Sequence, residues 1–119
     1  MEKAIVRNGI DNIAKYSELF AGKRVGLITG PTGVNKQLKS TIDIFAEMFN
    51  LTTLYAPEHG IRGERQAGAT VETYQDERTG LTVYSLYGMN KKPSSEMLAN
   101  VDILAIDIQD VGIRYYTYL

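Results

Sequence analysis

The most strand-like stretch of this chain is Val101-Asp102-Ile103-Leu104-Ala105-Ile106-Asp107-Ile108. Its centre, Ile103–Ile106, is continuously apolar. An uninterrupted apolar run of this length is typical of a strand that is covered on both faces, as the strands of parallel sheets are. The stretch therefore predicts a parallel sheet, and the elements that precede it determine how that sheet is built.

Two helices are predicted in the first half of the chain. From Gly9 to Phe20, apolar residues recur at spacings of three and four, which is the period of an amphipathic helix. Asp11 is expected to cap the amino end of this helix, and Gly22 falls where a helix-terminating glycine is common. A second helix, with apolar residues between positions 42 and 49, is expected to begin at a cap formed by Ser40 or Thr41.

Strand signals alternate with these helices. Arg24–Thr29 and Leu51–Ala56 are short β-type runs, and each is followed by a loop that contains glycine and proline. Residues 70–74 and 81–86 are expected to pair as a hairpin. A short third helix is predicted from a cap at Ser94 or Ser95 to Asn100, directly before the last strand.

This order of elements predicts an α/β fold with a mostly parallel sheet and flanking helices, because strands that alternate with helices form βαβ units. In the usual doubly wound order, the first strand is central and has the second and fourth strands on either side. The carboxyl ends of parallel strands meet at one edge of the sheet, where ligands bind in such folds.

Composition limits the classes of function. The chain has 119 residues, which is one domain's worth, and 13 basic against 14 acidic residues give a formal net charge of -1. This balance gives no electrostatic argument for binding nucleic acid or an anionic membrane. The absence of cysteine excludes disulfides, thiolate metal ligands and a cysteine nucleophile.

The sequence gives little information on the compartment. No apolar run reaches the length of a membrane span, and no signal peptide is visible at the amino terminus. The compartment is therefore left open, with the cytoplasm favoured. The sequence stops inside the apolar and aromatic run Ile113–Leu119, so we expect an incomplete fragment of a larger domain.

Four predicted strand ends carry unusual loops, namely Thr29–Gly33, Pro57–Gly60, Ser85–Gly88 and Asp107–Gly112. A single polar loop is commonplace, but four loops at one edge of a sheet predict a ligand site. Gly30-Pro31-Thr32-Gly33 lacks both the Gly-Lys-Ser/Thr ending of a P-loop and the glycine spacing of a dinucleotide site. A tight turn with close backbone approach is therefore favoured, with Thr32 and the backbone amides still able to contact a ligand.

Glu58 and His59 follow the second predicted strand and have three interpretations. Glu58 is a general acid or nucleophile with a nearby carboxylate as its complement. Alternatively the two residues ligate a metal, although one histidine with scattered carboxylates is a poor transition-metal set. In the third interpretation His59 bonds the loop backbone. We favour chemistry for Glu58 and a structural or supporting role for His59.

Three polar residues end the last strand. Strand alternation puts Asp107 and Gln109 on one face, with Ile108 on the other. Asp110 already belongs to the following loop, where it either joins the site or caps a helix that begins near Gly112. The residues alone favour neither role for Asp110.

Several of these motifs together resemble the NamZ/YbbC family. The matching runs occur in the same order from about Gly22 to the end of the chain, and they are Gly26–Val34, Ala56–Gly63, Ala67-Gly68, Thr79–Leu81, Tyr84–Gly88 and Asp107–Tyr118. The characterised activity of that family is exo-β-N-acetylmuramidase, which removes N-acetylmuramic acid (MurNAc) from the non-reducing ends of peptidoglycan fragments. Its members are much longer, with a Rossmann-like N-terminal domain, a smaller C-terminal domain and an active site expected between them.

The resemblance implies that residues 1–119 are the N-terminal portion of the Rossmann-like catalytic domain, without its remainder or the C-terminal domain. It makes Glu58 the candidate catalytic acid. The residues that it implies as support for Glu58 are His59, Arg62, Gln109, Asp110 and Tyr116. Beyond the resemblance, we take Asp110 as the candidate second catalytic carboxylate. Glycosidases use carboxylates, and no metal or cofactor is expected.

The implied substrate carries a lactyl carboxylate, which calls for a cation. Arginine binds carboxylates in a two-pronged geometry, so Arg62 is the first candidate for that contact and Arg114 the second. We expect Glu58, Asp110 and the Thr32 loop to line one site. A non-catalytic Rossmann-like module that binds a small ligand or partner and a metal-dependent hydrolase remain alternatives. The sequence does not indicate the oligomeric state.

Overall fold

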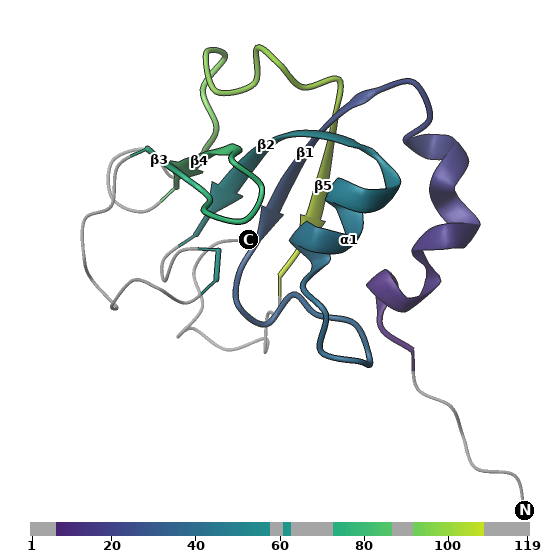
Figure 1. The fold of residues 1–119 in the computed structure, drawn as a ribbon. Helices are drawn as coiled ribbons and strands as arrows, with labels where there is room; N and C mark the ends of the chain where they lie inside the picture. Colours follow the sequence, from purple (N-terminus) through teal and green to yellow (C-terminus); the bar gives the residue numbers. More distant parts are fainter. Residues whose placement is uncertain (1–6, 58–60, 63–72, 87–91, 109–119) are drawn as a thin grey trace, which may run out of the picture.

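The computed structural model describes residues 7–57, 61–62, 73–86 and 92–108. Its elements in chain order are the 3-10 helix η1 (Gly9–Leu19), β1 (Arg24–Thr29), α1 (Thr41–Met48), β2 (Asn50–Ala56), β3 (Tyr74–Gln75), β4 (Thr82–Ser85) and β5 (Ile103–Asp107). The five strands form one sheet in the order β3-β4-β2-β1-β5. In Figure 1, α1 lies in front of this sheet and η1 lies beside it, on the β5 side.

The sheet is mostly parallel, as the sequence predicts. β1 pairs in parallel with both β2 and β5, and β2 pairs in parallel with β4. β3 is antiparallel to β4, as the predicted hairpin requires, while residues 70–72 of its predicted first strand lie outside the described residues. The first strand is central, with the second and the last strands on either side, so the α/β class and the expected strand order are both confirmed.

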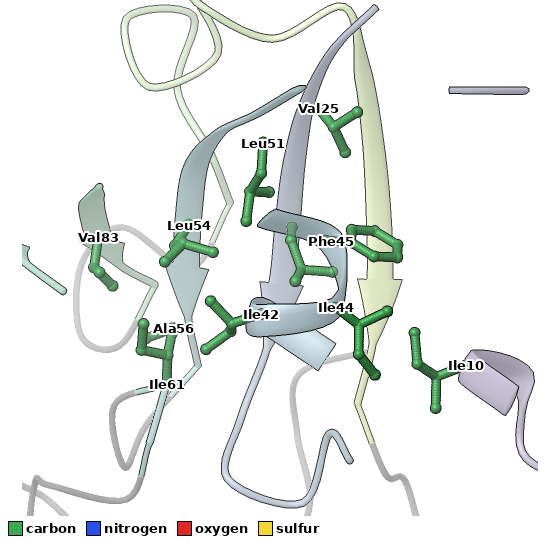
Figure 2. Close-up of a cluster of buried hydrophobic side chains, with 11 residues drawn as sticks. Ile10, Val25, Ile42, Ile44, Phe45, Leu51, Leu54, Ala56, Ile61 and Val83 are labelled. Carbon is green, nitrogen blue, oxygen red and sulfur yellow. The ribbon is translucent and has the colours of Figure 1, made fainter. Parts of the chain in front are cut away.

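One core fills the space between the sheet and the two helices. Figure 2 shows Ile42 and Phe45 of α1 in the same cluster as Leu54 and Ala56 of β2. All four are buried, and burying a side chain the size of isoleucine or phenylalanine contributes about 1.5–3 kcal/mol. α1 therefore covers this face of the sheet because its apolar residues recur at helical spacing.

The amino-terminal helix differs from the prediction in its type and in its cap. It is a 3-10 helix, and its N-cap is Asn8 rather than Asp11. Asp11 lies three residues further on, where its carboxylate accepts hydrogen bonds from the backbone N–H groups of Asn8 at 2.8 Å and Lys36 at 3.0 Å. Gly22 has a positive φ of 69°, so the expected helix-terminating glycine is confirmed.

Ser40 is the N-cap of α1, as one of the two predicted alternatives. Its hydroxyl accepts a hydrogen bond from the backbone N–H of Ile42 at 3.2 Å. Thr41 is instead the first residue of the helix, and its hydroxyl bonds to a residue of β5.

The second face of the sheet is less covered. Tyr55 is fully buried there with Ile28 and Leu86, and its hydroxyl donates to the backbone carbonyl of Met97 at 2.6 Å. The pKa of the Tyr55 phenol is raised to about 12, mainly because the phenol is buried and to a smaller extent because Tyr84 lies beside it. The Tyr55 hydroxyl of β2 therefore joins the sheet to the segment of residues 92–102.

The predicted helix from Ser94 to Asn100 is wrong, because this segment forms turns. Its backbone bonds run from Leu98 N–H to the Ser94 carbonyl and from Val101 N–H to the Leu98 carbonyl. The Ser94 hydroxyl accepts from Met97 N–H at 3.3 Å, which is a capping contact without a helix. A segment this short has too few residues to repay the cost of nucleating a regular helix.

β5 is the third departure from the prediction. Ile103 and Ala105 pack against the helix-side core, but Leu104 is 37% exposed and Ile106 is 58% exposed on the other face. β5 is the edge strand of this sheet within the described residues. Within the described residues β5 is therefore covered on one face only, which differs from the predicted coverage of both faces, since an apolar run does not report the position of its strand in a sheet.

Candidate functional site

The carboxyl ends of the parallel strands meet at one edge of the sheet. Thr29, the last residue of β1, pairs with Asp107, the last residue of β5. On the other side, Ile28 pairs with Tyr55, so β2 ends within one residue of the same level. The strands that lead to residue 58 and to residue 109 therefore flank β1 and end together.

The eight predicted site residues divide into two groups. Thr32 and Arg62 belong to the described part of the chain. The other six lie outside the described residues, and they are Glu58, His59, Gln109, Asp110, Arg114 and Tyr116. The predicted proximity of Glu58 and Asp110 stays a prediction, supported by the strand order that precedes each of them.

The Thr32 loop is a tight turn, as the sequence favours. The backbone N–H of Gly33 donates to the carbonyl of Gly30 at 3.0 Å, and Thr32 is exposed at the turn. Gly33 is buried, and a Cβ at this position would lie 2.2 Å from the Thr29 hydroxyl oxygen. The second glycine is therefore required for close packing of the loop on β1.

A small polar cluster lies under this turn. The Thr29 hydroxyl donates to the backbone carbonyl of Asp107 at 2.8 Å. The Thr41 hydroxyl donates to the Asp107 carboxylate at 2.5 Å. The Thr41 backbone N–H also donates to the Gly33 carbonyl at 2.8 Å. These contacts hold the ends of β1 and β5, the turn and the start of α1 against one another.

Arg62 lies in a second polar cluster, on the other side of β2. Its guanidinium bonds to both carboxylate oxygens of Asp76, at 2.7 Å and 3.0 Å, and to Asp43 at 3.0 Å. Asp76 is only 3% exposed and also accepts from the Thr79 hydroxyl at 2.6 Å and the Thr79 backbone N–H at 3.0 Å. Arg78 adds an ion pair to Asp43 at 3.3 Å.

The charges of this cluster stabilise one another. Burial alone would raise the pKa of the Asp76 carboxyl, but the hydrogen bonds from Arg62 and Thr79 outweigh it, and the pKa is lowered. The bond to Asp76 is the main cause of a raised pKa for Arg62, with Asp43 adding to it. Both groups are therefore held in their charged forms.

The sequence indicates where some polar residues of these clusters lie, but not which residues they contact. Asp107 was assigned to the strand end, but its bond to Thr41 joins residues 66 positions apart. Asp76 lies between the two strands of the predicted hairpin and is not among the predicted site residues, although it is the buried partner of Arg62. An aspartate in a turn that is followed three residues later by a threonine is a local signal for the hydrogen bonds between Asp76 and Thr79. No local pattern indicates that Arg62 is the ion-pair partner of Asp76.

Two hollows lie near these clusters. A groove of about 580 Å³ between α1 and the β3–β4 turn is lined in part by Lys39, Asp43 and Arg78. A smaller one, of about 180 Å³, is lined in part by Ile10, Phe45 and Asp107. No group of three or more metal-ligating side chains occurs among the described residues. In the same part of the chain, no helix has the length and apolar character needed to cross a membrane.

The family model "Exo-beta-N-acetylmuramidase NamZ, N-terminal" matches residues 25–119. The chain belongs to this NamZ N-terminal family. The resemblance of the strand-end motifs to NamZ/YbbC is thereby confirmed. A curated relative, the peptidoglycan beta-N-acetylmuramidase NamZ of Bacillus subtilis (strain 168), is 56% identical over 121 residues, which cover 99% of this chain and 29% of that protein.

Two solved structures support the NamZ N-terminal fold. A DUF1343 family protein of Bacteroides fragilis NCTC 9343 matches with a TM-score of 0.82 and 50% identity over 94% of this chain and 28% of that one. A second DUF1343 family protein of the same organism matches with a TM-score of 0.76 and 34% identity over 97% of this chain and 29% of that one. The chain thus spans less than a third of the length of these relatives.

Proposed function

We propose that the protein to which this chain belongs is a glycoside hydrolase that releases N-acetylmuramic acid from the non-reducing ends of peptidoglycan fragments. The observation that carries this proposal is the 56% identity, over 99% of this chain, to a protein named peptidoglycan beta-N-acetylmuramidase. The family model, named for exo-beta-N-acetylmuramidase, covers residues 25–119 and agrees with it. MurNAc-containing glycan fragments are the proposed substrates.

In this proposal, residues 1–119 are the first part of a Rossmann-like catalytic domain. The carboxyl edge of β1, β2 and β5 is its floor, with Thr32 exposed at the turn after β1. Glu58 follows β2 by two residues and is the proposed catalytic acid, while Asp110 follows β5 by three residues and is the proposed second carboxylate. Two carboxyl groups on either side of the glycosidic bond are the usual machinery of glycosidases.

The other proposed contacts lie beside these two acids in sequence. His59 and Gln109 each neighbour one of the carboxylates and are proposed to contact the sugar or support the acid. Tyr116 offers a ring that stacks on a sugar and a hydroxyl that bonds to it. Arg114 is proposed as the cation for the lactyl carboxylate of the substrate.

The test is the turnover of a chromogenic MurNAc glycoside by the full-length protein, wild type against Glu58→Gln. Glutamine keeps the size of glutamate but cannot donate a proton as a carboxylic acid does. We expect turnover to fall by several orders of magnitude, with an unchanged thermal unfolding midpoint. Glu77→Gln, which changes an exposed glutamate in the β3–β4 turn, is the matched control and should retain full turnover.

Three outcomes separate this proposal from its alternatives. Near-wild-type turnover by Glu58→Gln would remove Glu58 from the mechanism. No turnover by the wild type, together with measurable MurNAc binding, would favour a non-catalytic binding module. Wild-type turnover that is abolished by a chelator and restored by a divalent metal would favour a metal-dependent hydrolase.

A further inference from the structure

The Arg62 side chain joins three parts of the fold. Arg62 itself lies six residues beyond the end of β2, Asp43 is in the first turn of α1, and Asp76 begins the β3–β4 turn. The guanidinium reaches both acids at 3.0 Å or less, with a two-pronged contact to Asp76. Arg62 is 21% exposed and Asp76 is 3% exposed at the side chain, so this is a largely buried contact.

The chain next to Arg62 is also held. Ile61 is 1% exposed and packs in the helix-side core, and its backbone N–H donates to the Tyr74 hydroxyl at 3.3 Å. Pro57, directly after β2, is buried as well. Positions 57 and 61 are therefore both fixed, and only residues 58–60 lie between them. An anchor at position 62 sets one end of the short stretch that carries Glu58.

The charges around Arg62 argue against a role in binding the substrate's carboxylate. Among the described residues, Asp43 and Asp76 supply two negative charges to this network, and Arg62 and Arg78 supply two positive charges. These four charges balance, so the described part of the network offers no excess positive charge to an incoming anion. A third carboxylate would also have to compete with the buried, two-pronged Asp76 for the same guanidinium.

We propose that Arg62 is a positioning residue, which holds the chain after β2 on Asp76 and Asp43 so that Glu58 is correctly placed, and that it is not the ligand of the substrate's lactyl carboxylate. This proposal rests on the proposed function in one respect, the role of Glu58 as the acid. It replaces the expectation from sequence that Arg62 is the first candidate for the carboxylate, and it leaves that contact to Arg114.

The test compares Arg62→Lys, Asp76→Asn and the double variant in the full-length protein. Lysine keeps the charge but loses the fork that grips both oxygens of Asp76. The matched control is Arg24→Lys, because Arg24 makes the same two-pronged contact with Asp102, at 2.9 Å and 3.1 Å, on exposed residues at the amino end of β1 and before β5.

The kinetic readouts are kcat and KM for the MurNAc glycoside and the dissociation constant of free MurNAc. We expect both single variants to lower kcat by about 10- to 100-fold, since small misplacements of reacting groups have effects of that size. KM and the dissociation constant should change less than about threefold, and the double variant should be no worse than either single one. Arg24→Lys should match the wild type.

The opposite pattern would overturn the proposal. If Arg62 binds the lactyl carboxylate, Arg62→Lys weakens the binding of free MurNAc at least about tenfold, whereas Asp76→Asn leaves that binding unchanged or stronger. Equal kcat values for the wild type and both single variants would also overturn it.

A second readout does not depend on activity. Hydrogen exchange of the peptide that covers residues 57–62 should be faster in Arg62→Lys and Asp76→Asn than in the wild type, and unchanged in Arg24→Lys. Unchanged exchange in the first two variants would refute the anchoring role, whatever the enzyme does. A wild type without muramidase activity would refute the proposed function alone, because the exchange experiment still tests the anchor.

Discussion

The Thr41 hydroxyl lies 2.5 Å from Oδ2 of Asp107 and donates a hydrogen bond to it. This bond joins the first residue of α1 to the last residue of β5. Thr29 completes the contact from the end of β1, where its hydroxyl donates to the Asp107 carbonyl. The strand that leads to Gln109 and Asp110 therefore ends at a point fixed by two hydroxyl groups from other elements.

Gly33 is predicted to be required for the full stability of this arrangement. In Gly33→Ala, the new methyl group would lie 2.2 Å from the Thr29 hydroxyl oxygen and 3.3 Å from Oδ2 of Asp107. Relief requires movement of the turn or of the Thr29 side chain, and overpacking of this kind costs about 1–3 kcal/mol. Chemical denaturation should show a loss of that size.

The matched variants for this prediction are Thr29→Ala and the double variant Thr29→Ala/Gly33→Ala. Thr29→Ala removes the clashing oxygen and one hydrogen bond, which contributes about 0.5–1.5 kcal/mol. The double variant should lose less stability than the sum of the single losses, because the two changes act on the same contact. Strict additivity would show that the clash is not the cause.

Asp76 is predicted to make the free energy of unfolding depend on pH in the acidic range. Its pKa is lowered in the folded protein, so the unfolded chain binds a proton at higher pH than the folded one. Its contribution is therefore complete above the unfolded value of about 3.9 and is lost as the pH falls below it. Asp76→Asn should be less stable at pH 7 by about 1.5–3 kcal/mol and should lose less stability than the wild type between pH 5 and pH 3.

Urea denaturation at a series of pH values measures this effect. Glu77→Gln is the control, since it removes one carboxylate from the same turn at an exposed position. If the free energy of unfolding fell equally with decreasing pH in the wild type and in Asp76→Asn, the result would contradict this prediction. The bonds from Arg62 and Thr79 would then not be the cause of the loss of stability in acid.

Local sequence patterns predict a helix or strand well where apolar residues recur at the spacing of that element or where a capping residue precedes them. Arg24–Thr29 is found at its predicted bounds, and Ser40 caps α1 because a serine before an apolar periodic run is a local signal. The segment 94–100 and the exposed face of β5 were predicted wrongly. In both cases the outcome depends on what packs against the segment, which a local pattern does not contain.

The polar contacts of the site edge are harder to predict for the same reason. Strand order brings together two pairs of polar residues, namely Asp107 with Thr41 and Arg62 with Asp76. Their residue types were visible in the sequence, but their partners follow only from the topology β3-β4-β2-β1-β5. The motifs at the strand ends, taken together, indicated the family to which the chain belongs.

Residues 1–119 alone are predicted to be an incompetent muramidase. The matched relatives are more than three times as long as the part that this chain covers, and positioning by the rest of the protein accounts for much of catalysis. The purified 1–119 chain should turn over the MurNAc glycoside at under about a thousandth of the rate of the full-length protein. Comparable rates for the two would overturn this prediction.

Glu58 and Asp110 are predicted to share one site with the Thr32 turn. β2 and β5 flank β1, so their ends are two strand spacings apart, or roughly 10 Å. Glu58 and Asp110 follow these two ends, and side chains that reach inward over Thr29 would bring their carboxyl groups to the roughly 5–10 Å that glycosidases use. β1 lies between β2 and β5, so the turn after β1 would form the floor of the site.

An experimental structure of the full-length protein with MurNAc bound measures this separation directly. A distance of about 5–5.5 Å would indicate a retaining reaction, and about 6.5–9.5 Å an inverting one. Asp110 could instead cap a helix that begins near Gly112, and the second carboxylate would then come from another part of the protein. A separation beyond about 20 Å, twice the upper range, would rule out the shared site, because no side-chain rotation covers that distance.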